Sequence, residues 1–184
     1  MNKKEPIFCF YEAQSLGKRI PELESFISSD SDIAYRYALE IIKGRWPEAE
    51  EIISKNIVAS YSYAKDVLKG RFYLAENFIK KYPEYAFEYA KNIIKGPWKD
   101  CEEYISQDYC YSYKYSKYVL KNRFILGEKN SLDQNSEYMY YYAKNIIKGK
   151  LPEELHNKML ALALDNQDKF VVEYFTLIKN KNEI

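Results

Sequence analysis

Lysine side chains recur in pairs four residues apart along the middle of the chain. We name these residues the lysine ladder: Lys65 and Lys69, Lys91 and Lys95, Lys117 and Lys121, Lys144 and Lys148. Residues four apart lie on one face of a helix, so each pair holds two positive charges together at a cost of about a few tenths of a kcal/mol. Such a surface suits the binding of carboxylate or phosphate groups. The structural alternative is that the lysines offset helix dipoles and keep the surface soluble.

A second recurring pattern places a glutamate five residues after an arginine. It occurs at Arg19 and Glu24, Arg45 and Glu50, Arg71 and Glu76, Arg123 and Glu128. A guanidinium group can hold a carboxylate or a phosphate through two parallel hydrogen bonds. Arg45, Arg71 and Arg123 are therefore further candidates for binding an anion. The alternative is a structural ion pair within a repeat or to its neighbour, worth about 0–1 kcal/mol if exposed.

An internal repeat of 26 residues must position these side chains. Its clearest mark is an aromatic residue at Tyr37, Tyr63, Tyr89 and Tyr115, each 26 residues after the last, with Tyr142 following after 27. Another aromatic residue stands two positions before each of these, a small residue stands directly after, and an apolar-apolar-Lys-Gly run closes the block. A second block, Arg-Trp-Pro-Glu-Ala-Glu at 45–50, recurs in weaker form after each first block.

Each repeat predicts a hairpin of one long and one short helix. Residues 61–69 carry a broad apolar face at helical spacing. We expect Gly70 and its equivalents to supply the left-handed residue that ends the long helix, and Pro47 to begin the short one. Arms of roughly 12 and 8 residues are too short to be stable alone, so the hairpins must stack. The small residues after the aromatic position fit close helix packing.

The predicted architecture is an all-α solenoid of stacked two-helix repeats of 26–27 residues with a C-terminal helical cap. We expect a single helical-repeat domain over residues 1–184. Its units span approximately 8–32, 33–58, 59–84, 85–110, 111–137 and 138–155, and the cap spans 156–184. After Gly149 the repeat pattern fades, and residues 153–164 and 168–179 predict two further helices.

Residues that usually carry catalysis or bind metal are sparse. His156 is the single histidine, and its equivalents in the other repeats are all polar, so we expect it to face solvent. Cys101 stands where other repeats have Ala49, Ala75 or Gly127, which predicts a small buried hydrophobe. No cysteine and histidine spacing fits a zinc site. The sequence therefore predicts no catalytic residue, no metal site, no cofactor and no enzyme.

The aromatic residues Trp46, Phe72, Trp98 and Phe124 lie at the junction between the two helices of successive hairpins. We favour a role in the core between repeats. The alternative is an exposed ring that stacks on a base or anchors a peptide.

Composition limits the classes of partner. Hydrophobic residues make up 47% of the chain and charged residues 30%, with a net charge of +1 and 20 tyrosines. No global basic excess draws the protein to nucleic acid or to an anionic membrane, and no stretch is long and apolar enough to span a bilayer. Three cysteines without paired spacing favour a reducing compartment. We expect a cytoplasmic protein.

The repeat block from Tyr37 to Glu50 and the run from Tyr89 to Gly96 resemble short helical-repeat proteins of tailed bacteriophages. The units of those proteins read approximately Tyr-Ala-x-x-Val-Ile-Lys-Gly-Arg-Trp-Pro-Glu-Ala-Glu. The resemblance covers roughly residues 10–155 and is weakest at 123–136 and 150–155. No activity is established for that family. The resemblance implies an accessory phage protein that acts in the cytoplasm of an infected bacterium.

Two hypotheses for function follow. The favoured one is a non-enzymatic binding protein that presents a helical surface to a host protein, which it would inhibit during infection. The alternative is a sponge or reader for an anionic ligand, either a nucleotide signal or a nucleic acid, bound by a Lys, Arg and Tyr surface. Salt separates the two hypotheses, because anion binding weakens steeply as the salt concentration rises.

Overall fold

The computed structural model describes residues 5–165 and 168–182. Within these ranges every regular element is a helix and no strand is present, which confirms the predicted all-α fold of repeated helix pairs. The chain divides into two compact units. The first contains the described residues up to Lys81 together with Asn92–Ile94, and the second contains Tyr82–Lys91 and the described residues from Lys95 onward. This division does not test the prediction of a single domain.

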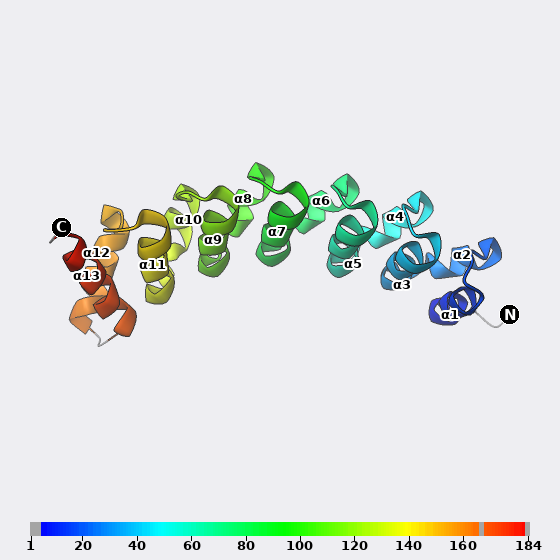
Figure 1. The fold of residues 1–184 in the computed structure, drawn as a ribbon, viewed down its shortest axis with the longest axis horizontal. Helices are drawn as coiled ribbons and strands as arrows, with labels where there is room; N and C mark the ends of the chain where they lie inside the picture. Colours follow the sequence, from blue (N-terminus) through cyan, green and yellow to red (C-terminus); the bar gives the residue numbers. More distant parts are fainter. Residues whose placement is uncertain (1–4, 166–167, 183–184) are drawn as a thin grey trace. The chain divides into compact units, whose positions relative to one another are not determined.

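In the first unit, long and short helices alternate along the chain (Figure 1). The long helices are α1 (Pro6–Leu16), α3 (Ser31–Tyr37) with its continuation η1 (Ala38–Ile42), and α5 (Ile57–Ser62) with its continuation η2 (Tyr63–Leu68). The short helices are α2 (Pro21–Ile27), α4 (Pro47–Ile53) and α6 (Tyr73–Ile79). Helix α1 packs on α3 and α3 packs on α5, so successive hairpins stack as predicted.

The second unit repeats this alternation. Its long helices are α7 (Pro83–Tyr89) with η3 (Ala90–Ile94), whose residues Asn92–Ile94 belong to the first unit, α9 (Tyr109–Tyr115) with η4 (Ser116–Leu120), and α11 (Ser136–Tyr142) with η6 (Ala143–Ile147). Its other helices are α8 (Lys99–Ile105), α10 (Ile125–Asn130), the 3-10 turn η5 (Leu132–Gln134), α12 (Glu153–Asp165) and α13 (Lys169–Asn182). Helices α7, α9, α11 and α13 pack on one another in that order, so α13 takes the place of a long helix in the cap.

Polar side chains begin most of the long helices. The carboxylate of Asp30 accepts hydrogen bonds from the backbone N–H groups of Asp32 and Ile33 at 3.0 and 2.9 Å. Asn56, Asp108 and Asn135 cap α5, α9 and α11 in the same way. These caps satisfy N–H groups that a helix leaves unpaired at its start. Proline at the first position begins α2, α4 and α7 instead.

Each of the five regular long helices ends on a lysine in the left-handed conformation. The φ angles of Lys43, Lys69, Lys95, Lys121 and Lys148 are 57°, 50°, 59°, 52° and 57°. The last turn before each lysine is π-helical, and the carbonyl of the small residue accepts from two N–H groups, as Ala90 does from Lys95 and Gly96. The sequence-based assignment of this conformation to the glycines is wrong. The carbonyl of the small residue sets where the backbone reverses, and the residue that reverses is the lysine.

This geometry predicts opposite tolerance at two neighbouring residues. Gly96→Ala should leave the free energy of unfolding within about 0.5 kcal/mol of its starting value or raise it, because Gly96 has no positive φ and an added Cβ meets no atom within 4 Å. Lys95→Val should destabilise by about 1–2 kcal/mol, because a β-branched residue strongly disfavours the left-handed region. Urea unfolding of both variants checks this. A larger loss for Gly96→Ala would restore the glycine assignment.

The core of every repeat is built around the second aromatic residue. Tyr37, Tyr63, Tyr89, Tyr115 and Tyr142 all have 0% exposure. The small residue after each is equally buried, as predicted, at Ala38, Ala64, Ala90, Ser116 and Ala143. The rings at Trp46, Phe72, Trp98 and Phe124 are also buried and lie 5.0–5.2 Å from the preceding tyrosine ring. The predicted role in the core between the helices is confirmed.

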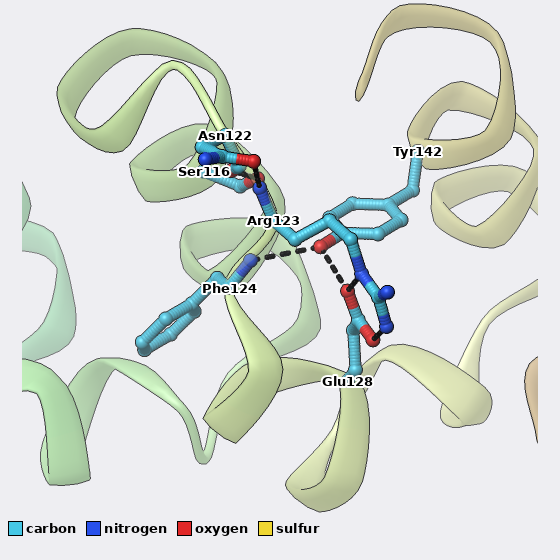
Figure 2. A network of polar contacts seen from close by, with 6 residues as sticks. All are labelled: Ser116, Asn122, Arg123, Phe124, Glu128 and Tyr142. Atoms are coloured by element: carbon cyan, nitrogen blue, oxygen red, sulfur yellow. Dashed lines mark hydrogen bonds and ion pairs between the residues drawn. The ribbon is translucent and has the colours of Figure 1, made fainter. Parts of the chain in front are cut away.

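The hydroxyl group of the core tyrosine joins a polar network that links its repeat to the preceding one (Figure 2). The backbone N–H of Phe124 donates to the Tyr142 hydroxyl at 2.8 Å, and that hydroxyl donates to the carboxylate of Glu128. Arg123 holds the same carboxylate through Nε and one terminal nitrogen, at 2.9 and 2.6 Å. Burial, followed by this hydrogen bond to Glu128, raises the pKa of Tyr142 above its usual value. The tyrosine thus satisfies a buried backbone donor and ties two helices together.

The inserted residue between Tyr115 and Tyr142 shortens one helix. Helix α10 ends at Asn130, and the chain then forms η5, in which Leu132 is fully buried. The structure absorbs the insertion in this 3-10 turn and anchors it through Leu132.

Candidate functional site

Half of the lysine ladder lies beside aromatic rings. The Nζ atoms of Lys65, Lys91, Lys117 and Lys144 lie 5.9, 5.4, 5.5 and 5.3 Å from the ring centres of Tyr61, Phe87, Tyr113 and Tyr140 respectively. Each ring belongs to the residue four positions earlier on the same long helix. A cation over an aromatic face is attracted by the ring quadrupole. The repeat therefore holds one ammonium group in a defined place on four long helices, whereas α3–η1 has Leu39 at this position.

The other half of the ladder is formed by exposed lysines at the helix ends. Lys69, Lys95, Lys121 and Lys148 are the left-handed residues described above. Their backbone conformation is set by the turn. They add positive charge close to the ends of the long helices, where it is favourable.

The first aromatic residue of each repeat contacts the following long helix. The Tyr35 hydroxyl donates to Asp66 at 3.0 Å, and the amides of Asn92 and Asn145 donate to the hydroxyls of Tyr61 and Tyr113 at 3.0 and 2.9 Å. Where the first aromatic residue is Phe87, which has no hydroxyl group, the following helix carries Tyr118, and their ring centres lie 6.4 Å apart. A residue on the next long helix therefore contacts the first aromatic residue whether that residue is tyrosine or phenylalanine. These contacts align neighbouring long helices within each unit.

The three candidate arginines are engaged inside their own repeats. Arg45, Arg71 and Arg123 each form two hydrogen bonds with the glutamate five residues later, at 2.6–3.0 Å. Their side chains remain 65%, 39% and 45% exposed. The geometry is that of the structural ion pair considered above. An anion would meet guanidinium groups whose charge a carboxylate already offsets.

A basic and aromatic pocket of about 360 Å³ lies in the second unit between α9–η4 and α11–η6. Its wall consists of three lysines, four tyrosines and an asparagine: Lys114, Lys117, Lys144, Tyr113, Tyr118, Tyr138, Tyr141 and Asn145. We name it the Lys117 pocket. Among the residues that the structure describes, no acidic side chain lines it. Of the predicted binding residues, the structure brings Lys117 and Lys144 together here.

Two lysines of this pocket are positioned by tyrosine hydroxyls. Lys117 Nζ donates to the Tyr113 hydroxyl at 3.1 Å, and Lys144 Nζ donates to the Tyr140 hydroxyl at 3.1 Å. The hydrogen bond to Tyr113 raises the pKa of Lys117, and the one to Tyr140 raises the pKa of Lys144. The charge of Glu173 on α13 also raises the pKa of Lys144. Both lysines are therefore fully charged at neutral pH.

Sequence reasoning missed Lys114, Tyr118, Tyr138 and Tyr141. The positions of Lys114, Tyr118 and Tyr141 do not recur as one residue type, so the repeat pattern hid them, whereas Tyr138 recurs as Tyr85 and Tyr111. One signal was present in the sequence: Lys114 stands where the previous repeat has Glu88. That exchange of charge marks the site as different from its neighbours.

A larger pocket, about 460 Å³, lies in the first unit and is less suited to an anion. It is lined by Arg45 and Arg71, but also by Glu50 and by apolar residues of η2 and α6. Glu50 and Glu76 hold the two guanidinium groups. The Lys117 pocket has the stronger positive character despite its smaller volume.

His156 does not face solvent as expected. It is half-buried, its Nδ1 lies 2.6 Å from the Tyr174 hydroxyl, and its ring packs edge-on against Tyr174 and Phe175. Tyr174 also accepts a hydrogen bond from the N–H of Leu151 at 3.2 Å, as Tyr142 does from Phe124. In the cap, His156 thus contacts the tyrosine hydroxyl that a glutamate contacts in the other repeats. Burial, followed by the charge of Lys150, lowers its pKa.

No disulfide joins the cysteines in the described part of the chain. Cys101 is fully buried, as predicted, and its thiol donates to the carbonyl of Trp98 at 3.0 Å. Burial raises the pKa of this thiol well above its usual value. Over residues 5–165 and 168–182, no group of His, Cys, Asp and Glu side chains is placed to hold a metal ion, and no helix there has the length and apolar character needed to cross a bilayer.

Comparison of the chain with protein-family models, with curated proteins and with solved structures finds no match.

Proposed function

We propose that this chain is a non-enzymatic helical-repeat binding protein that holds a phosphate-bearing ligand on the lysine ladder. One observation carries the proposal. The long helices hold ammonium groups over aromatic rings at Lys65, Lys91, Lys117 and Lys144, and two of these lysines meet in a pocket without a carboxylate. Fixed cations lose less conformational freedom on binding an anion than free ones do.

The absence of catalysis is part of the proposal. A nucleophile or general base needs an accessible group beside a partner that activates it. His156 is engaged with Tyr174, and the thiol of Cys101 is fully buried with a raised pKa. These contacts favour structural roles for both residues.

A host protein is the second candidate partner. Tyr73 and Leu74 on α6 are 71% and 57% exposed, and neighbouring exposed apolar side chains are typical of protein–protein contacts. The resemblance to phage proteins would place such a partner in the cytoplasm of an infected bacterium. This hypothesis draws on fewer contacts than the anion hypothesis, which we therefore place first.

The lysine ladder is tested by changing Lys91, Lys95, Lys117 and Lys121 together to glutamine. Glutamine keeps most of the length and helix propensity of lysine but removes its charge. With inorganic tripolyphosphate as the probe, isothermal titration calorimetry should show at least about a tenfold loss of affinity, equal to about 1.4 kcal/mol. The affinity of the unchanged protein should also fall as salt rises from about 50 to 200 mM.

The matched control changes Lys55, Lys80, Lys99 and Lys129 to glutamine. These four lysines lie on or directly after short helices, and the control removes the same net charge. It should bind tripolyphosphate nearly as tightly as the unchanged protein. Equal losses in both variants, or no binding of tripolyphosphate by the unchanged protein, would refute the proposal.

A further inference from the structure

We propose that the Lys117 pocket is a site for a nucleoside polyphosphate, with its phosphates on the lysines and its base on the exposed tyrosine ring. This inference rests on the proposed function, because it names the ligand class and the place on the lysine ladder where the ligand is held. The argument depends on how this pocket differs from the same place in the neighbouring repeats.

The first difference is charge. Lys114 stands where the preceding repeat has Glu88 and the one before has Ser62, while Lys117 corresponds to Lys91 and Lys65. The Lys117 pocket is therefore the place where a third ammonium group joins the two ladder lysines. None of the three forms an ion pair with a carboxylate in the described chain. Three unneutralised cations suit a ligand with more than one phosphate group.

The second difference is aromatic. Tyr118 stands where other repeats have Asp66, Asn92 and Asn145. Its side chain is 48% exposed, and Lys117 Nζ lies 5.1 Å from its ring centre. An exposed ring next to an ammonium group allows one ligand to stack on the ring and place its phosphate on the cation. A phosphate without a base would use the lysines alone.

The remaining tyrosines give the pocket a fixed wall. The ring centres of Tyr138 and Tyr113 lie 5.7 Å apart in an edge-to-face contact, and Tyr141 lies 6.2 Å from Tyr113. Asn145 donates one hydrogen bond to the Tyr113 hydroxyl and another to the carbonyl of Tyr141, both at 2.9 Å. These contacts pre-form the cavity. Its volume of about 360 Å³ lies in the range of pockets that hold one small ligand rather than a strand of nucleic acid.

The contributions of the base and of the phosphates to the affinity are separated by isothermal titration calorimetry with three probes. These are adenosine triphosphate, inorganic tripolyphosphate and adenosine. We expect adenosine triphosphate to bind one-to-one and at least about tenfold more tightly than either other probe, because it alone uses both the ring and the cations. Equal affinity for adenosine triphosphate and tripolyphosphate would overturn this inference and leave the proposed function standing. Binding of none of the probes would refute both. Tighter binding of a thymidylate oligonucleotide than of adenosine triphosphate would also overturn it, in favour of a single strand.

Variants assign the roles of the side chains. Tyr118→Leu keeps an apolar side chain against Phe87 but removes the flat ring. It should therefore lower the affinity for adenosine triphosphate about tenfold and leave the affinity for tripolyphosphate unchanged. The double variant Lys117→Gln and Lys144→Gln should lower the affinity for both adenosine triphosphate and tripolyphosphate. The matched controls are Tyr73→Leu, an exposed tyrosine of the first unit, and Lys99→Gln combined with Lys129→Gln, two exposed lysines outside both the ladder and the pocket. Control losses as large as those of the pocket variants would overturn the assignment.

Discussion

Replacing Tyr142 with phenylalanine is expected to destabilise the protein by about 1–3 kcal/mol. The ring would still fill its place in the core, where it is fully buried. The lost hydroxyl would leave the N–H of Phe124 without its acceptor and Glu128 without one of its donors. A buried donor that loses its partner costs more than an average hydrogen bond contributes. Tyr142→Ala should cost about 3–5 kcal/mol, because it also opens a cavity.

Tyr61→Phe is the matched control for the tyrosine network. Tyr61 is the first aromatic residue of its repeat, and its hydroxyl accepts a hydrogen bond from the partly exposed Asn92. The corresponding residue one repeat later is Phe87, so a ring without a hydroxyl group already fits this position. The loss of stability in urea unfolding should stay below about 1 kcal/mol. A loss as large as that of Tyr142→Phe would mean that the buried network contributes no more than an exposed contact.

The repeat made most of the fold predictable. The recurring aromatic residue and the small residue after it mark buried positions, and the structure buries both in every regular repeat. The cap was predictable for a different reason. The apolar residues of its two helices, α12 and α13, recur at helical spacing, so these helices could be predicted without the repeat pattern.

The errors arose where backbone geometry departs from the α-helix or from the repeat. The left-handed residue was assigned to glycine because glycine tolerates that conformation best, whereas the π-helical turn places the lysine there. His156 was assigned to solvent because its equivalents in the other repeats are all polar. In the cap, Leu155 stands in the place of the glutamate and is buried, and His156 reaches Tyr174 from the next position.

The candidate site was predictable only in part. Lysines that recur at a fixed spacing were visible, and two of them reach the Lys117 pocket. The pocket itself depends on single departures from the repeat, such as Lys114 and Tyr118. Residues that recur in every unit of a repeat protein indicate its fold. Residues that depart from the pattern can indicate a site that belongs to one repeat alone.

Replacing Gly127 with alanine is expected to destabilise the protein by about 1–3 kcal/mol through overpacking, although alanine favours a helix by about 1 kcal/mol. Gly127 lies in α10, where an added Cβ would be 2.6 Å from Cδ1 of Phe124 and 2.7 Å from both Cβ and Oγ of Ser112. Ser112 cannot give way cheaply, because its hydroxyl is bonded to the carbonyl of Ile105 and lies 3.1 Å from the hydroxyl of Ser131. Both serines are fully buried.

The matched control for Gly127→Ala is Cys101→Ala, at the corresponding position of α8. That repeat already accommodates a Cβ, so the change removes one sulfur atom and should cost less than about 1.5 kcal/mol. Urea unfolding compares the two variants. Helix propensity alone predicts that Gly127→Ala stabilises the protein, and an observed gain would show that α10 can move away from α9. A loss would show that Phe124 and Ser112 leave no room for a Cβ at position 127.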